Sequence, residues 1–180
     1  MNIVAPVIKS TSSGSIAAAV VAVVRTLAVL LLTLAATAMP KPAAASASAG
    51  VSEAEVARAL SQRGLPLRLG NDNFREPMIE SYAGATRFYV YFYECSQTRT
   101  CQNIQFRTGF ATRGRVSLAK VNDWSSRWRF GRMYLDPEGD IILDMDVDAR
   151  RGLPPEVLAA QVSRWLEVVR EAEAFIGWGR

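Results

Sequence analysis

The chain is 180 residues long, which is enough for one domain and a targeting segment. It contains no histidine, which excludes His-based acid/base catalysis, Ser-His-Asp and Cys-His nucleophilic sites, and His-ligated metal sites. The net charge of +4 does not indicate nucleic-acid binding, because Lys9, Arg25 and Lys41 lie near the N-terminus and all 17 acidic residues follow Val51. We therefore expect neither a nucleic-acid partner nor a cofactor.

Residues 1–50 have the features of export information. Lys9 and Arg25 supply positive charge, and the short apolar run Leu27–Ala36 has the length of a signal-peptide core. Residues 45–49 twice match the small-x-small pattern that precedes signal peptidase cleavage. The pattern favours a cleaved signal peptide with an Ala/Ser/Pro linker over residues 1–50, followed by a domain over residues 51–178. A membrane anchor and a disordered tail are the alternatives, so membrane contact is expected only through an uncleaved leader. The predicted location is periplasmic or secreted.

The rest of the chain predicts an α+β fold in which helices pack on an antiparallel sheet, in the order α-β-β-β-α-β-β-α. Ser52 and Glu55 form a capping box for the first helix, which stops at Gly64, and residues 65–75 are expected to form an irregular connection. The later elements are the strands Met78–Tyr82, Thr86–Glu94 and Asn103–Phe110, the helix Ser117–Arg129, the strands Arg132–Leu135 and Asp140–Asp148, and a helix that begins at Pro154 and runs to Ile176.

The strand Thr86–Glu94 alternates between two aromatic faces. Phe88, Val90 and Phe92 share one face, and Tyr89, Tyr91 and Tyr93 share the other. The first face is expected to enter the core. For the tyrosine face, cover by a helix is the favoured interpretation, and a partner or dimer surface is the alternative.

The two cysteines follow one predicted strand and precede the next. Cys95 and Cys101 flank a polar loop, so a disulfide that closes the hairpin is predicted, and export would provide the oxidising compartment that it needs. A loop of this length would contribute about 2 kcal/mol on the chain-entropy model. A redox-active pair is the alternative, but the spacing is not C-x-x-C.

Two tryptophans lie one turn apart on the predicted helix Ser117–Arg129. Core packing of Trp124 and Trp128 is favoured over a partner surface or ligand-stacking platform. Five arginines lie near this helix, at positions 113, 115, 127, 129 and 132. A solvated face is the favoured account of them, and a site for an anion or an acidic partner is the alternative.

An acidic row is the one pattern that resembles a metal site. Asp144, Asp146 and Asp148 match the opening of an EF-hand loop, but Ala149 stands where glycine is needed and Pro155 where glutamate is needed. We therefore favour a solvated face that resists aggregation, with calcium binding as the alternative.

Four motifs then carry a family resemblance. FYVYFYEC, CQNIQFRTGF, SLAKVNDWSSRWRFGRMYLDPEGD and DMDVD together span roughly residues 51–176. In these motifs the chain resembles the YbjN-domain proteins of bacteria. The resemblance implies a fold similar to the type III secretion chaperones and a role as a sensory-transduction regulator, loosely linked to stress responses and motility. The family has no established catalytic residues, so the resemblance assigns none here.

These observations together predict an exported, non-enzymatic module of the YbjN type, either protein-binding or chaperone-like and regulatory. Its partner would be an unidentified protein or a second copy in a homodimer. One alternative is a carboxylate-based, metal-dependent enzyme that uses Asp140, Asp144, Asp146 and Asp148. The other is a purely structural envelope protein.

Overall fold

The computed structural model describes residues 50–179. The predicted signal peptide and linker over residues 1–50 lie almost entirely outside the described residues and stay a prediction. The elements, in chain order, are β1 (Val51–Ser52), α2 (Glu53–Gln62), β2 (Leu67–Asn71), β3 (Pro77–Ala83), β4 (Thr86–Cys95), β5 (Thr100–Phe110), α3 (Leu118–Arg127), β6 (Arg132–Leu135), β7 (Ile141–Asp148) and α4 (Pro155–Ile176). None of these helices is long and apolar enough to cross a membrane.

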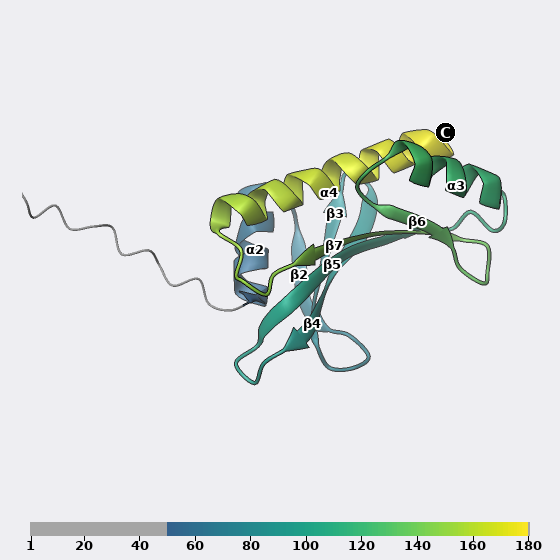
Figure 1. Ribbon diagram of the computed structural model, residues 1–180. Helices are drawn as coiled ribbons and strands as arrows, with labels where there is room; N and C mark the ends of the chain where they lie inside the picture. Colours follow the sequence, from purple (N-terminus) through teal and green to yellow (C-terminus); the bar gives the residue numbers. More distant parts are fainter. Residues whose placement is uncertain (1–49, 180) are drawn as a thin grey trace, which may run out of the picture. The chain divides into compact units, whose positions relative to one another are not determined.

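The strands form one antiparallel sheet with the order β2-β3-β4-β5-β7-β6, and β1 pairs with the start of β5. The three described helices lie on the same face of this sheet, and α4 runs along its length (Figure 1). The prediction of an α+β fold with helices on an antiparallel sheet is thus confirmed.

The prediction of an irregular connection over residues 65–75 is wrong in part. Leu67 pairs with Ser81 and Leu69 pairs with Ile79, so β2 forms an edge strand of the sheet. The alternation of Leu67 and Leu69 with Arg68 is typical of a strand. Gly70 and Asn71 complete β2, but both residue types favour turns, so the sequence indicated a loop. The two-residue strand β1 was also missed, since two residues carry no periodicity.

Local signals account for the helix ends. The Ser52 hydroxyl accepts a hydrogen bond from the Glu55 amide, and the Glu55 carboxylate accepts one from the Ser52 amide, which is the predicted capping box. Helix α4 begins with Pro155 and ends at Ile176, and Gly177 caps it with a φ of 73°, the left-handed conformation that glycine adopts readily.

The core lies between the sheet and the helices. Trp165 of α4 is fully buried and contacts Phe88 of β4 and Phe106 of β5, with ring centroids 5.9 Å and 5.7 Å away. Trp124 of α3 is also fully buried and stacks on Trp128 at 4.3 Å. Trp124 is therefore a core residue and cannot belong to an exposed partner surface, while Trp128 is half-buried against the same core.

The two buried indoles differ in one hydrogen bond. The Trp124 indole donates to the Gly131 carbonyl at 2.9 Å, whereas the buried Trp165 indole N–H has no partner among the described residues. We expect Trp124→Phe to lower the free energy of unfolding by about 1 kcal/mol more than Trp165→Phe, because only the first change breaks a hydrogen bond. Urea denaturation of both variants measures this, and an equal or larger loss in Trp165→Phe would contradict it.

The disulfide that the sequence favours is present. Cys95 and Cys101 pair across β4 and β5 with Cα atoms 3.9 Å apart, and their sulfur atoms are bonded. The bond closes the hairpin at the end where β1 also joins β5, because Val51 pairs with Cys101. The disulfide therefore lies where β1, the first strand of the described residues, joins the hairpin of β4 and β5.

Candidate functional site

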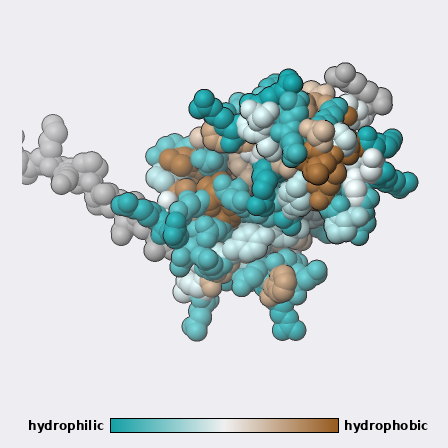
Figure 2. Space-filling model, turned by 45° about the vertical axis from the view of Figure 1, so that its right-hand side comes forward, coloured by the Kyte–Doolittle hydropathy of each residue, from teal (hydrophilic) through white to brown (hydrophobic). Residues whose placement is uncertain are grey.

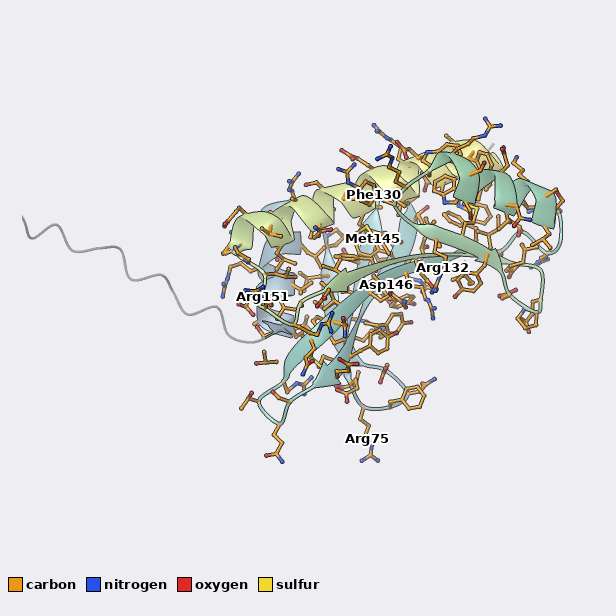
Figure 3. All side chains as sticks on the ribbon, viewed as in Figure 1. Arg75, Phe130, Arg132, Met145, Asp146 and Arg151 are labelled. Carbon is orange, nitrogen blue, oxygen red and sulfur yellow. A yellow bond between two sulfur atoms is a disulfide. The ribbon has the colours of Figure 1, made fainter. Side chains whose placement is uncertain are left out.

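The candidate site is the face of the sheet opposite the helices, which we call the open face. It carries Tyr89, Tyr91 and Tyr93 of β4, Gln105 and Arg107 of β5, Arg132 and Tyr134 of β6, and Asp144 and Asp146 of β7. Figure 3 shows Arg132 and Asp146 on this side of the sheet, whereas Met145 points toward α4.

The favoured interpretation of the tyrosine strand, cover by a helix, is wrong for the part of the chain that the structure describes. On the core side Phe88, Val90 and Phe92 are fully buried. On the other side Tyr89 and Tyr91 are half-buried and Tyr93 is 39% exposed. The sequence could not decide this, because the alternation gives two faces but does not say on which of them the helices pack.

Strand register brings one row of charged and aromatic residues together across the open face. Tyr89 pairs with Arg107, Arg107 pairs with Asp144, and Asp144 pairs with Arg132. Directly opposed residues in antiparallel strands have Cβ atoms about 5 Å apart. The row therefore alternates aromatic, basic, acidic and basic side chains within direct contact range.

Asp144 is the centre of this row and is fully buried. Arg107 donates to both of its carboxylate oxygens, from Nε at 2.7 Å and from a terminal nitrogen at 3.0 Å, and Arg132 donates to Oδ2 at 2.8 Å. The same arginine, Arg107, also donates to the Tyr134 hydroxyl at 2.9 Å. The expectation of a solvated acidic face is therefore wrong for Asp144, since two arginines from neighbouring strands cover it.

The electrostatics of Asp144 follow from these contacts. Burial by itself raises the pKa of Asp144, but the hydrogen bonds from Arg107 and Arg132 outweigh it, so its pKa lies below the usual value. The hydrogen bonds that Arg107 donates to Asp144 raise the pKa of Arg107 further above its ordinary value. The carboxylate is thus ionised at neutral pH, and this network fixes the two guanidinium groups in place.

The arginines also hold the tyrosine rings. Arg107 lies 5.9 Å from the centre of the Tyr91 ring, and Arg132 lies 5.4 Å from that of Tyr134. The ring centres of Tyr89 and Tyr91 lie 6.0 Å apart. Burial raises the pKa of Tyr91 above its usual value, although Arg107 acts in the opposite direction. These contacts place the Tyr91 and Tyr134 rings beside the two guanidinium groups.

The remaining acidic residues of β7 have separate partners. Asp146 accepts a hydrogen bond from Gln105 at 2.6 Å. Asp148 is exposed and pairs with Arg150 at 2.6 Å, and this pairing lowers the pKa of Asp148 to about 2. Within residues 50–179, no group of three or more His, Cys, Asp or Glu side chains is placed to hold a metal ion. Each of the three predicted carboxylates, Asp144, Asp146 and Asp148, thus has its own arginine or amide partners.

The sequence did not indicate Arg107 or Tyr134 as members of the site, and it grouped Arg132 with the arginines near α3 and not with Asp144. The charged Arg107 lies in a strand that is otherwise rich in buried residues, and this contrast could have indicated it as a site residue. Its pairing with Asp144, however, depends on the register of two strands that are far apart in sequence.

Comparisons with known proteins identify the family of this chain. Residues 52–178 match the family YbjN, described as "Putative bacterial sensory transduction regulator". Among solved structures the chain is similar to "Crystal structure of YbjN, a putative transcription regulator from E. coli", with 13% identity over 66% of this chain and 89% of that chain and a TM-score of 0.49. No curated protein matches the chain. The family description is that of a regulator and names no reaction. Because the family match covers well over half of the sequence, the chain belongs to the YbjN family.

Proposed function

We propose that this chain is an exported, non-enzymatic protein-binding module of the YbjN type, which holds another protein chain on its open face. The observation that carries the proposal is the uncovered tyrosine strand beside the fixed Asp144–Arg107–Arg132 network. Tyrosine and arginine are the residues that most often dominate protein interfaces, because they give large contact areas and several hydrogen bonds.

The chemistry of the open face supports a polypeptide as its occupant. The face carries both charge signs, with Arg107 and Arg132 around Asp144 and an exposed Asp146 two residues further along β7, and its aromatic side chains still reach solvent. Figure 2 shows the molecule from one side, where hydrophilic side chains predominate and hydrophobic ones form separate groups. A face of this mixed kind suits a chain with alternating polar and apolar residues, or a second copy in a two-fold homodimer.

The disulfide between Cys95 and Cys101 supports the export part of the proposal. Such bonds persist in the periplasm and outside the cell and are rare in the cytosol. The N-terminal pattern of charge, apolar core and small residues is a second and independent support. Both observations favour a location in the periplasm or outside the cell.

A crosslinking pull-down from the cell envelope, made with the full chain and oxidised cysteines, tests the proposal. We expect the wild type to capture a protein that Tyr89→Ser/Tyr91→Ser loses, because both rings lie on the open face. The matched control is Arg164→Ala/Glu167→Ala, which removes an exposed ion pair on α4 and should leave the capture unchanged.

Circular dichroism establishes that each variant is folded, and sedimentation of the purified chain separates a homodimer from a heterologous partner. A folded tyrosine variant that captures the same proteins as the wild type would contradict the proposal. A wild-type chain that stays monomeric and captures nothing would contradict it as well, and would favour a purely structural role.

A further inference from the structure

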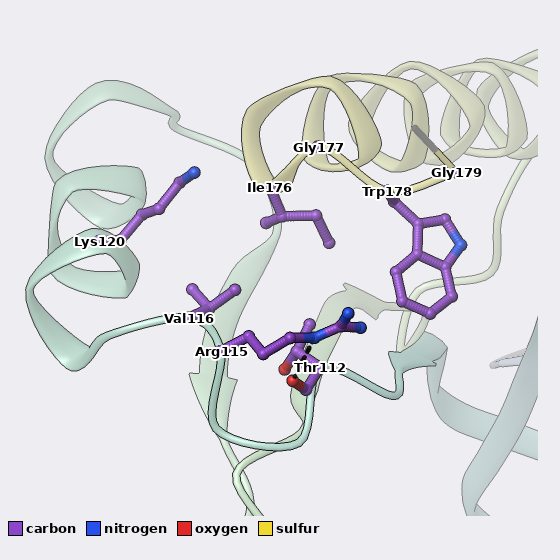
Figure 4. A pocket seen from close by; sticks show the side chains of 8 residues that line it. All are labelled: Thr112, Arg115, Val116, Lys120, Ile176, Gly177, Trp178 and Gly179. Carbon is purple, nitrogen blue, oxygen red and sulfur yellow. Dashed lines mark hydrogen bonds between the residues drawn. The ribbon is translucent and has the colours of Figure 1, made fainter.

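A second feature lies on the helix side of the sheet, away from the open face. The loop after β5, the first turn of α3 and the end of α4 enclose a cleft of about 520 Å³. Figure 4 shows Lys120 on one side of this cleft, Trp178 on the other, and Arg115 reaching across toward Trp178. Sites for small molecules commonly have volumes of about 300–1,000 Å³.

The cleft is positively charged. Among the described residues of its lining, Arg115 and Lys120 are the charged ones, and none of these residues is acidic. Neither forms an ion pair within residues 50–179. The Arg115 Nε donates to the Thr112 carbonyl at 3.1 Å, which orients the guanidinium and leaves its terminal nitrogens without a hydrogen-bond partner among the described residues.

The position of Lys120 increases this imbalance. It lies in the first turn of α3, where the helix dipole already supplies positive potential, and this turn contains no acidic residue. The Lys120 amine lies 5.2 Å from the centre of the Phe175 ring, which is a cation–π contact. An anion in the cleft would offset both the lysine charge and the helix dipole.

One part of the cleft lining is apolar. Val116 and Ile176 contribute aliphatic surface, and the Trp178 indole is 36% exposed. Trp178 is held by an edge contact with the Phe110 ring at 5.2 Å. A flat aromatic surface beside two cations suits a planar, apolar molecule that carries one negative charge.

We propose that this cleft binds a small aromatic carboxylate. The Arg115 guanidinium pairs with the carboxylate, the Lys120 amine adds a second positive charge, and the aromatic body lies against Trp178. The site is separate from the open face, so its test is independent of the protein-binding proposal.

Titration of the ¹⁵N-labelled chain with 1-naphthoate, followed by NMR, tests the proposal. We expect saturable shifts at the Trp178 indole N–H and at the amides of Lys120 and Gly177. The uncharged 1-naphthamide should bind about tenfold more weakly, because it lacks the charge that Arg115 recognises. Inorganic phosphate should bind more weakly too, since it has no apolar body.

Three variants locate the site. Arg115→Gln and Trp178→Ala should each weaken naphthoate binding about tenfold, whereas Arg58→Gln, which removes an exposed cation on α2, should leave it unchanged. The proposal is overturned if naphthoate causes no saturable shifts at these positions. It is also overturned if naphthamide or phosphate binds as well as naphthoate, or if both cleft variants bind like the wild type.

Discussion

Replacement of Asp144 by alanine is expected to lower the free energy of unfolding by about 2 kcal/mol at neutral pH. The change removes a fully buried carboxylate that accepts hydrogen bonds from Arg107 and Arg132. Breaking a buried ion pair costs about 3–5 kcal/mol, but the side chains of Arg107 and Arg132 are 36% and 62% exposed, so water compensates for part of the loss. Urea denaturation with the cysteines oxidised measures this value.

The same carboxylate makes the stability depend on pH. The folded pKa of Asp144 lies below its unfolded value, so its contribution is present above the unfolded pKa of about 3.9 and is lost as pH falls through the folded pKa. Asp144→Asn should therefore lose less stability on acidification than the wild type. The Asn variant should still lose some stability on acidification, because the folded pKa of Asp148 is also lowered, to about 2, and this carboxylate is protonated as pH falls.

The control for Asp144 is Asp123→Ala. Asp123 forms an exposed pair with Arg127 at 2.7 Å, which is worth less than about 1 kcal/mol. An Asp144→Ala variant that is as stable as Asp123→Ala would show that the network does not hold the open face in place.

Replacement of Gly131 by alanine is expected to cost about 3 kcal/mol. Gly131 connects α3 to β6 with a φ of 80°, a conformation that costs a residue with a side chain about 1 kcal/mol. An added Cβ would also lie 2.5 Å from Cγ1 of Val168 on α4 and 3.3 Å from Cδ1 of Leu143 on β7. Val168 is a short, branched side chain on a packed helix, so α4 would have to move away from the sheet.

Gly84→Ala separates the two causes. Gly84 has a φ of 63°, but an added Cβ there meets nothing within 4 Å. The free energy of unfolding of this control should fall only by the cost of the backbone conformation, about 1 kcal/mol, in the same denaturation experiment. If Gly131→Ala and Gly84→Ala lose the same amount, the close contact between the connection and α4 does not contribute to stability.

Local signals made much of the fold predictable. The Ser52 and Glu55 capping box and the alternation in β4 are encoded by neighbouring residues, and the structure shows both as expected. Strand β2 was missed because its strand signal extends over only a few residues before Gly70.

The site was less predictable, since it depends on contacts between distant residues. The tyrosine strand was visible in the sequence, but its exposure depends on where α2, α3 and α4 pack. The contact between Arg107 and Asp144 joins two strands with a helix and another strand between them in the chain. No local pattern encodes which arginine covers which carboxylate.

The most direct test of the open face as a binding surface places a photoreactive phenylalanine analogue at Tyr91, or at Glu171 on the exposed side of α4, in the full chain in the cell envelope. We expect a defined crosslinked product from Tyr91, either to another protein or to a second copy, and none from Glu171. Products from both positions, or from Glu171 alone, would contradict the assignment of the open face. The absence of any product from Tyr91 in a folded, exported chain would contradict it equally.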